Sequence, residues 1–181
     1  MVLFVWLFRL IANSPVLRSL ALVSQLIAFA CLSSTCGKIL PKYGVMIPDT
    51  RIFGYTVSEL HEFYEILEEE GCRSYVECAN NDFFPMMPAY TLLMGTWLVL
   101  ASRRLGLSDH ISNLAVLVMT FDMIETYHQR QGCLRTLSDF EIQASSAALR
   151  SKWGLIGIIC AIYGLAILKE IRSRLSKRKQ K

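Results

Sequence analysis

Charged residues are scarce in this chain. Asp, Glu, Lys and Arg make up 19% of its 181 residues, whereas about 25% is usual in soluble domains. The hydrophobic fraction of 53% excludes a disordered or collagen-like chain. Long uncharged runs are hard to hide in one small core, but a bilayer accepts about 20 successive apolar residues directly. The composition therefore predicts a polytopic membrane protein with no separate soluble enzyme domain.

Several signatures of catalysis and binding are also missing. No Cys-x-x-Cys pair occurs, which argues against a thiol–disulfide oxidoreductase, and there is no phosphate-cradling glycine loop or Gly-x-Ser-x-Gly elbow. His61 and Glu65 are one helical turn apart, but no second histidine lies nearby, so we expect no metal site. The basic C-terminal tail has no interleaved aromatic residues, which argues against nucleic acid as a partner. We expect no cofactor.

Four apolar segments account for most of the remaining chain: approximately residues 15–36, 83–102, 111–127 and 153–169. They predict an all-α, four-transmembrane-helix bundle that forms a single domain over residues 1–181. Ser14 and Pro15 are a favourable start for the first helix, because serine caps free backbone donors and proline tolerates the first helical position. The residues before Ser14 are too few to cross the bilayer. They form an interfacial segment, a continuation of the first helix or a targeting peptide.

Positive charge sets the expected orientation, because Lys and Arg near span ends are retained on the cytosolic side. A four-span layout places eleven Lys and Arg residues on one side of the membrane and eight on the other. The richer side carries the basic tail, residues 169–181, so both termini should face the cytosol. Lys177 and Lys179, fifth and third from the C-terminus, resemble the dilysine retrieval signal of endoplasmic-reticulum membrane proteins. We therefore expect the endoplasmic reticulum, with a mitochondrial or other endomembrane location as the alternative.

The first outer loop contains a helix signature. Thr56 and Glu59 form a capping box, in which each side chain binds the other residue's backbone N–H. Apolar residues then recur at helical spacing among glutamates, which predicts an acidic amphipathic helix over residues 57–70, ended by Gly71. We expect this helix to rest its apolar stripe on the bundle, and a lid or docking surface is the alternative.

A second capping box, Ser138 with Glu141, opens a helix that can continue into the last span, because no helix breaker intervenes. Small residues recur along it at every third or fourth position: Ala144, Ala147, Ser151, Gly154, Gly157, Ala161 and Gly164. Such a stripe lets another helix approach closely in lipid. We expect it to pack inside the bundle. A membrane-protein partner or a homo-oligomer through the same face is the alternative.

Four of the six cysteines fall at or beyond the outer ends of the predicted spans: Cys36, Cys72, Cys78 and Cys133. In an oxidising lumen, thiols in two loops tend to pair. The most natural loop-to-loop bridge joins Cys72 to Cys133, with Cys36 and Cys78 as alternative members.

Ionisable residues within the predicted spans are the strongest functional signal. Asp82 precedes the second span, and Asp122 and Glu125 lie three residues apart on one face of the third. When the second and third spans pack as antiparallel neighbours, the start of one and the end of the other lie at the same depth in the membrane. We therefore expect these three acids to share one outer-facing polar pocket beside the bend at Pro85 and Pro88. Its other expected members are two tyrosines and three cationic partners: Tyr90, Tyr127, Arg73, Arg150 and Lys152.

An ionisable residue inside a span is costly, so a function or a specific partner is the default interpretation. The cluster is a structural network, a site for a lipid or amine, or an acid–base pair acting on a lipid. For the whole protein we expect a non-catalytic membrane component or accessory subunit. The alternative is a small lipid- or amine-binding pocket protein or a lipid or sterol isomerase-like enzyme that uses the buried carboxylates, and a proton-coupled transporter is the third interpretation.

The layout is similar to that of one known group. Four spans with acidic residues in the bundle, Phe83-Phe84-Pro85 directly after Asp82, and a dilysine-like tail resemble the emopamil-binding and sigma-2-receptor group of sterol isomerases and amine-binding proteins. The resemblance implies a four-helix bundle with a lipid or amine ligand. It carries over no functional residue, because the acidic pair of the third span departs from that group's pattern.

Overall fold

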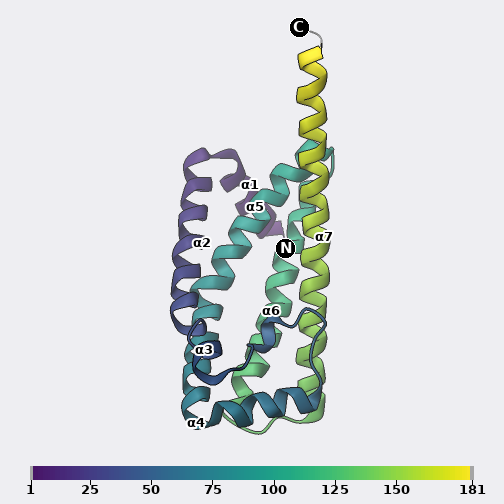
Figure 1. The fold of residues 1–181 in the computed structure, drawn as a ribbon. Helices are drawn as coiled ribbons and strands as arrows, with labels where there is room; N and C mark the ends of the chain where they lie inside the picture. Colours follow the sequence, from purple (N-terminus) through teal and green to yellow (C-terminus); the bar gives the residue numbers. More distant parts are fainter. Residues whose placement is uncertain (1, 180–181) are drawn as a thin grey trace.

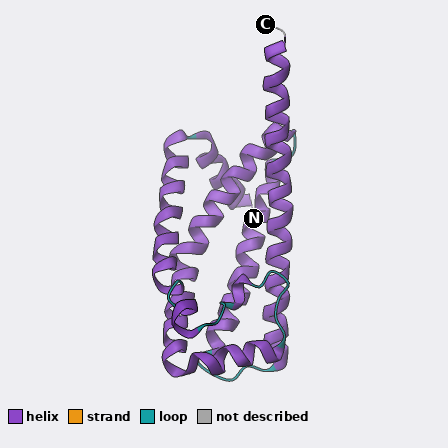
Figure 2. Ribbon diagram, in the orientation of Figure 1, coloured by secondary structure: helices purple, strands orange, loops and turns teal. Residues whose placement is uncertain are grey.

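The computed structural model describes residues 2–179, and all of the regular structure in this range is helical (Figure 1). The helices in chain order are α1 (Val2–Asn13), α2 (Pro15–Cys36), α3 (Ile39–Tyr43), α4 (Val57–Asn81), α5 (Met87–Leu105), α6 (Asn113–Gly132) and α7 (Asp139–Lys179). Short helical turns occupy Pro48–Thr50 and Asp109–Ser112, and a bend at Asp82–Met86 joins α4 to α5. The longest irregular segment, residues 44–56, joins α3 to α4, and the other connections are short (Figure 2). The all-α class is confirmed, and residues 180–181 of the basic tail lie outside the described range.

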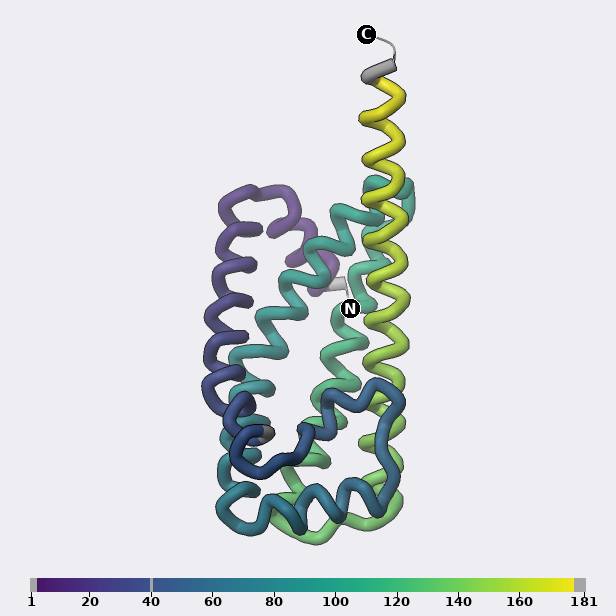
Figure 3. Tube along the Cα trace, in the orientation of Figure 1, coloured from purple at the N-terminus to yellow at the C-terminus, as the bar shows by residue number. Residues whose placement is uncertain are grey.

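The helices α2, α5, α6 and α7 run alongside one another between two ends of the molecule (Figure 3). α2 and α6 run toward one end, and α5 and α7 run back. The α1–α2 and α5–α6 connections lie at the same end as the C-terminal part of α7. We call this the basic end, because it carries Arg103 and Arg104 in the last turn of α5. The first half of α4 and the α6–α7 connection lie at the opposite end, called the loop end (Figure 1).

Three stretches of helix are long and apolar enough to cross a membrane by length and composition: Pro15–Tyr43, Val57–Leu105 and Asp139–Lys177. They contain the first, second and fourth predicted spans. α6 is not among them, because polar residues along its length lower its hydropathy. Only Ala21 and Ala28 of α2 are buried, so most of its apolar surface faces outward. This arrangement is consistent with an integral membrane protein.

The N-terminal segment forms a separate helix, α1, which packs against α5. The ring of Phe8 is fully buried over Gly95 of α5, where an added Cβ atom would come within 2.5 Å of the ring. A larger residue at position 95 would therefore displace the Phe8 ring. The chain turns at Ser14, whose hydroxyl accepts a hydrogen bond from the Leu17 N–H at 3.3 Å, as the sequence predicts. The turn excludes α1 as a continuation of α2 (Figure 1).

α4 begins at the predicted capping box. The Thr56 N–H donates to the Glu59 carboxylate at 2.7 Å, and the Glu59 N–H donates to the Thr56 hydroxyl at 3.3 Å. The apolar stripe that follows is buried against the bundle. The predicted end at Gly71 is wrong, because the helix is instead interrupted at Glu68, with φ 52° and ψ −163°, and continues to Asn81. Gly71 is a buried helical position where an added Cβ would lie 2.8 Å from Leu67.

A bend at Asp82–Met86 separates α4 from α5. Pro85 lacks a backbone N–H, so the helical hydrogen-bond ladder cannot pass through it regularly. Phe84, just before it, has the extended backbone angles φ −154° and ψ 118°. The second predicted span, 83–102, is therefore a bend followed by α5. Asp82 stands at the start of the bend, in hydrogen-bond contact with α6.

α7 also begins at its predicted capping box. The Glu141 N–H donates to the Ser138 hydroxyl at 3.3 Å, and the Ser138 N–H donates to Glu141 at 2.9 Å. The helix then continues without a break into the apolar segment 153–169, whose start lies about 18 Å beyond Glu141 at 1.5 Å per residue. Hydrogen bonds from the Arg135 guanidinium and from Ser138 lower the pKa of Glu141 to about 2.

The small-residue stripe of α7 does not pack inside the bundle, contrary to expectation. Added Cβ atoms at Gly154, Gly157 and Gly164 would meet nothing within 4 Å. Larger side chains such as Leu149 and Ile159 form the buried face of the helix instead. These side chains fill the space toward the neighbouring helices, which turns the small residues outward.

The disulfide joins Cys36, at the end of α2, to Cys78 in the second half of α4. The preferred pairing of Cys72 with Cys133 is therefore corrected: both are free thiols in the structure. The reason is the length of α4. A helix that ended at residue 70 would leave Cys78 in a loop, whereas the observed helix carries it beside α2.

Candidate functional site

A cluster of charged side chains is buried toward the loop end of the bundle. At its centre is Lys152 of α7, whose Nζ lies 2.8 Å from Oδ1 of Asp122 and 2.7 Å from Oε2 of Glu125. It also contacts Oδ1 of Asp49 in the turn Pro48–Thr50. The Lys152 and Asp122 side chains are 5% and 8% exposed, and Glu125 is fully buried. One buried ammonium group thus binds carboxylates from α6 and from the loop before α4, and we call this set the Lys152 cluster.

The face of α6 explains why these acids lie together. Glu125 and Thr126 follow Asp122 by three and four residues, so both side chains project from the side of the helix that carries Asp122. Tyr90 of α5 donates a hydrogen bond to the second oxygen of Asp122 at 2.6 Å. The hydroxyl of Thr126 donates to Asp82 at 3.1 Å. The bend after α4 therefore places Asp82 next to the acidic face of α6.

Gln129 extends the polar face of α6 by one further turn toward the loop end. Its Nε2 donates to Oε1 of Glu125 at 2.7 Å and to the Tyr55 hydroxyl at 3.3 Å, and its Oε1 accepts from the Tyr75 hydroxyl. The Tyr55 and Ser145 hydroxyls share a hydrogen bond of 2.6 Å. Burial raises the pKa of Tyr55 to about 12, so this hydroxyl stays neutral near pH 7. The network fixes the position of the Glu125 carboxylate.

A cavity of about 200 Å³ lies beside the cluster, between α2, α4 and α6. Its polar lining comprises Asp49, Thr50, Tyr75, Asp82, Thr126 and Gln129. The remaining wall is largely apolar and includes the Cys36–Cys78 disulfide. Among the side chains that the structure describes, no Lys or Arg nitrogen lies within 4.0 Å of the Asp82 carboxylate. The cavity therefore presents a carboxylate without a paired cation.

The described side chains of the site include four carboxylates, Asp49, Asp82, Asp122 and Glu125, but one ammonium group, Lys152, which pairs with all of them except Asp82. An unpaired carboxylate in a low-dielectric environment costs several kcal/mol unless a proton or another cation neutralises it. Oxygens of Asp49, Asp122 and Glu125 lie within 4.8 Å of one another, a spacing that suits metal ligands. The Lys152 ammonium already lies among these oxygens, so the space left for a further cation is the cavity beside Asp82.

Three of the residues expected in the pocket lie elsewhere. Tyr127 is 50% exposed and is not part of the network. Arg73 pairs with Glu69 at 2.6 Å on the exposed surface of α4. Arg150 is exposed, because it lies two positions from Lys152 on α7 and residues so spaced do not share a helix face. Lys152 is thus the cationic partner that the structure brings to the acids, together with Tyr90 as their hydroxyl donor.

Several residues of the site were not expected from the sequence: Asp49, Tyr55, Tyr75, Thr126 and Gln129. Thr126 and Gln129 had a usable signal, because they continue the spacing of Asp122 and Glu125 along one face of α6. No comparable sequence pattern indicates Asp49 or Tyr55 as members of the site. They lie in the irregular segment between α3 and α4, whose path depends on long-range contacts.

The arrangement offers negative charge and hydrogen-bond acceptors on one side of a small cavity and apolar surface on the other. This combination suits a ligand with a positively charged head and a short apolar body. No protein-family model matches the chain, and no curated protein or solved structure is found to be similar to it.

Proposed function

We propose that the chain is a four-span protein of an endomembrane, with α6 as the additional crossing and with the α1–α2 connection and the C-terminal tail on the cytosolic side. α6 packs along α7 and directs its acidic residues at Lys152 rather than at lipid. Such pairing lowers the cost of ionisable groups within a span. The basic end is then the cytosolic end, because Lys and Arg are retained there. The dilysine-like tail favours the endoplasmic reticulum.

The function that the site supports best is binding of a small organic cation, such as an amine, in the cavity beside Asp82. The observation that carries this proposal is that the Asp82 carboxylate faces the cavity without a paired cation. It lies on the cavity wall and accepts a hydrogen bond from the neutral hydroxyl of Thr126, with no Lys or Arg nitrogen of a described side chain within 4.0 Å. An ammonium ligand supplies the missing charge and donates charge-assisted hydrogen bonds. Asp49, whose side chain is 40% exposed, offers a second acceptor near the surface.

The size of the cavity limits the ligand. Pockets for drug-sized molecules occupy about 300–1,000 Å³, whereas this cavity measures about 200 Å³. A sterol is too large for it, which disfavours a sterol isomerase. The Cys36–Cys78 disulfide holds α2 against α4 at this cavity and limits its expansion. In this role the protein is a non-catalytic membrane component whose pocket binds a ligand. A purely structural accessory subunit needs no such ligand.

Thermal unfolding of the full-length protein in detergent, with a panel of amines from methylammonium to choline, tests this function. A ligand that binds only the folded state raises its stability by RT ln(1 + [L]/Kd), about 2.7 kcal/mol at one hundred times Kd. We expect at least one amine to raise the Tm of the wild-type protein. Asp82→Asn keeps the side-chain shape and an acceptor for Thr126 but removes the charge, so the amine-dependent shift should disappear.

Glu62→Gln is the matched control, because Glu62 is an exposed acid on α4 at the same end of the molecule. This variant should retain the full amine-dependent shift. If no amine in the panel stabilises the wild type, the cation site is excluded and the accessory-subunit interpretation takes its place. The same conclusion follows if Asp82→Asn and Glu62→Gln respond alike.

A further inference from the structure

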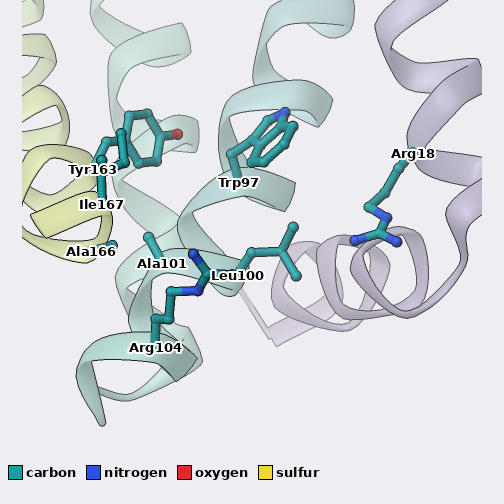
Figure 4. A pocket seen from close by; sticks show the side chains of 8 residues that line it. All are labelled: Arg18, Trp97, Leu100, Ala101, Arg104, Tyr163, Ala166 and Ile167. Atoms are coloured by element: carbon teal, nitrogen blue, oxygen red, sulfur yellow. The ribbon is translucent and has the colours of Figure 1, made fainter. Parts of the chain in front are cut away.

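A second hollow lies at the basic end, where residues of α2, α5 and α7 surround it (Figure 4). Its volume is about 500 Å³. Apolar and aromatic side chains line most of it, among them Trp97 and Leu100 of α5 and Tyr163 of α7. Arg18 of α2 and Arg104 of α5 are the charged residues of the lining. We call this hollow the basic groove.

The polarity of the basic groove changes along the helix axes. Arg18 lies in the first turn of α2 and Arg104 in the last turn of α5, so both are at the basic end. Trp97 is seven residues before Arg104, about 10 Å deeper along α5 at 1.5 Å per residue. The Trp97 side chain is 51% exposed, although it stands in an apolar stretch of the helix. The groove therefore has a cationic rim and an open apolar interior.

Within the described residues, the two arginines are at most partly neutralised, because Arg104 shares its carboxylate and Arg18 has none. Arg104 lies 3.5 Å from Glu170, and Glu170 is shared with Arg174, which is closer at 2.6 Å. No carboxylate oxygen lies within 4.0 Å of the Arg18 guanidinium in the part of the chain that the structure describes. Guanidinium groups bind phosphate oxygens well, because their planar N–H donors match the geometry of the anion. The rim therefore has capacity to bind a phosphate group.

We propose that the basic groove binds one anionic phospholipid, with its headgroup at the rim that carries Arg18 and Arg104 and an acyl chain against Trp97. A free phosphate ion makes no use of the apolar interior, and a zwitterionic lipid brings its own cation to a rim that is already positive. An anionic phospholipid matches both the cationic rim and the apolar interior of the groove. The lipid also fills space between α2 and α7 and adds contacts to α2, of which only Ala21 and Ala28 are buried by protein.

Fluorescence quenching in vesicles tests the proposal. The full-length protein is reconstituted in phosphatidylcholine that contains a minor fraction of either brominated phosphatidylglycerol or brominated phosphatidylcholine. Subtracting the signal of a Trp97→Phe variant isolates the quenching of Trp97. Because each basic group near the phosphate favours an anionic lipid, we expect the wild type to prefer the brominated phosphatidylglycerol by about tenfold in apparent affinity. Added inorganic phosphate should leave this preference unchanged.

The double variant Arg18→Gln/Arg104→Gln should lose the preference. Arg172→Gln/Lys177→Gln, which removes the same charge from the exposed tail, should keep it. An unchanged Tm in detergent shows that a variant is folded, and Arg18→Gln alone replaces the double variant if its Tm falls. Equal quenching by both lipids in the wild type contradicts the proposal. Equal loss in both double variants, or loss of the preference on adding phosphate, contradicts it as well.

Discussion

Replacing Lys152 by methionine tests whether this ammonium holds the buried acids together. Methionine fills a similar volume but leaves Asp122 and Glu125, now 8% and 0% exposed, without the group that lies 2.8 and 2.7 Å from them. Removing one partner of a buried ion pair costs about 3–5 kcal/mol, because the remaining charge has no compensation. In a chain of this length such a loss lowers Tm by about 10 °C.

The assay is thermal unfolding of the purified protein in detergent at neutral pH, with Arg150→Met as the matched control. Arg150 is on the same helix but exposed, so its loss should change stability by less than about 0.5 kcal/mol. Combining Lys152→Met with Asp122→Asn should recover part of the loss, because one of the unpaired charges is then gone. An unchanged or higher Tm for Lys152→Met alone would refute the role of the ammonium.

Three further changes test other parts of the structure. The pKa of Glu141 is about 2, below its ordinary value of 4.5, so its contribution to stability is complete at neutral pH and is lost as the pH falls from about 4.5 toward 2. The stability difference between wild type and Glu141→Gln should shrink over that interval in acid unfolding, and a constant difference would contradict the assignment. Replacing Cys36 and Cys78 together by serine opens a loop of 42 residues and should cost about 4 kcal/mol in denaturant unfolding; a peptide map of non-reduced protein without this linkage would rule the bridge out. Gly95→Leu should displace the Phe8 ring, because an added Cβ comes within 2.5 Å of it, and speed limited proteolysis of α1 while α5 stays protected; unchanged proteolysis would show that α1 does not depend on this contact.

Hydropathy and capping signals were sufficient for most of the fold, because both depend on local sequence. The starts of α2, α4 and α7 follow from Ser14, Thr56 and Ser138, whose side chains bind nearby backbone groups. The interruption of α4 has no such signal. It falls at Glu68, an ordinary helix former, and Gly71 three residues later stays helical because tertiary contacts bury it. The outward face of the α7 glycines likewise depends on which side chains fill the neighbouring space.

The candidate site was predictable where its residues share a helix face. Asp122 and Glu125 are three residues apart and therefore share a helix face. In an antiparallel bundle their depth in the membrane matches that of Asp82 and Lys152. That Lys152, and neither Arg73 nor Arg150, pairs with the acids was not predictable, because the pairing depends on the rotation of α7 against α6. Asp49 was missed because its turn reaches the cluster only through long-range contacts with α7, including the bond from the Trp153 ring N–H to its carbonyl at 3.2 Å.

The most direct test of the proposed function is isothermal titration of the detergent-purified protein with the amine that stabilises it best. We expect one binding site per chain in the wild type and in Glu62→Gln. Asp82→Asn should weaken the affinity by about tenfold to a hundredfold, since a hydrogen-bonded charge pair contributes about 1.5–3 kcal/mol. Equal affinity in wild type and Asp82→Asn, or more than one site per chain, would contradict a single cation site beside Asp82.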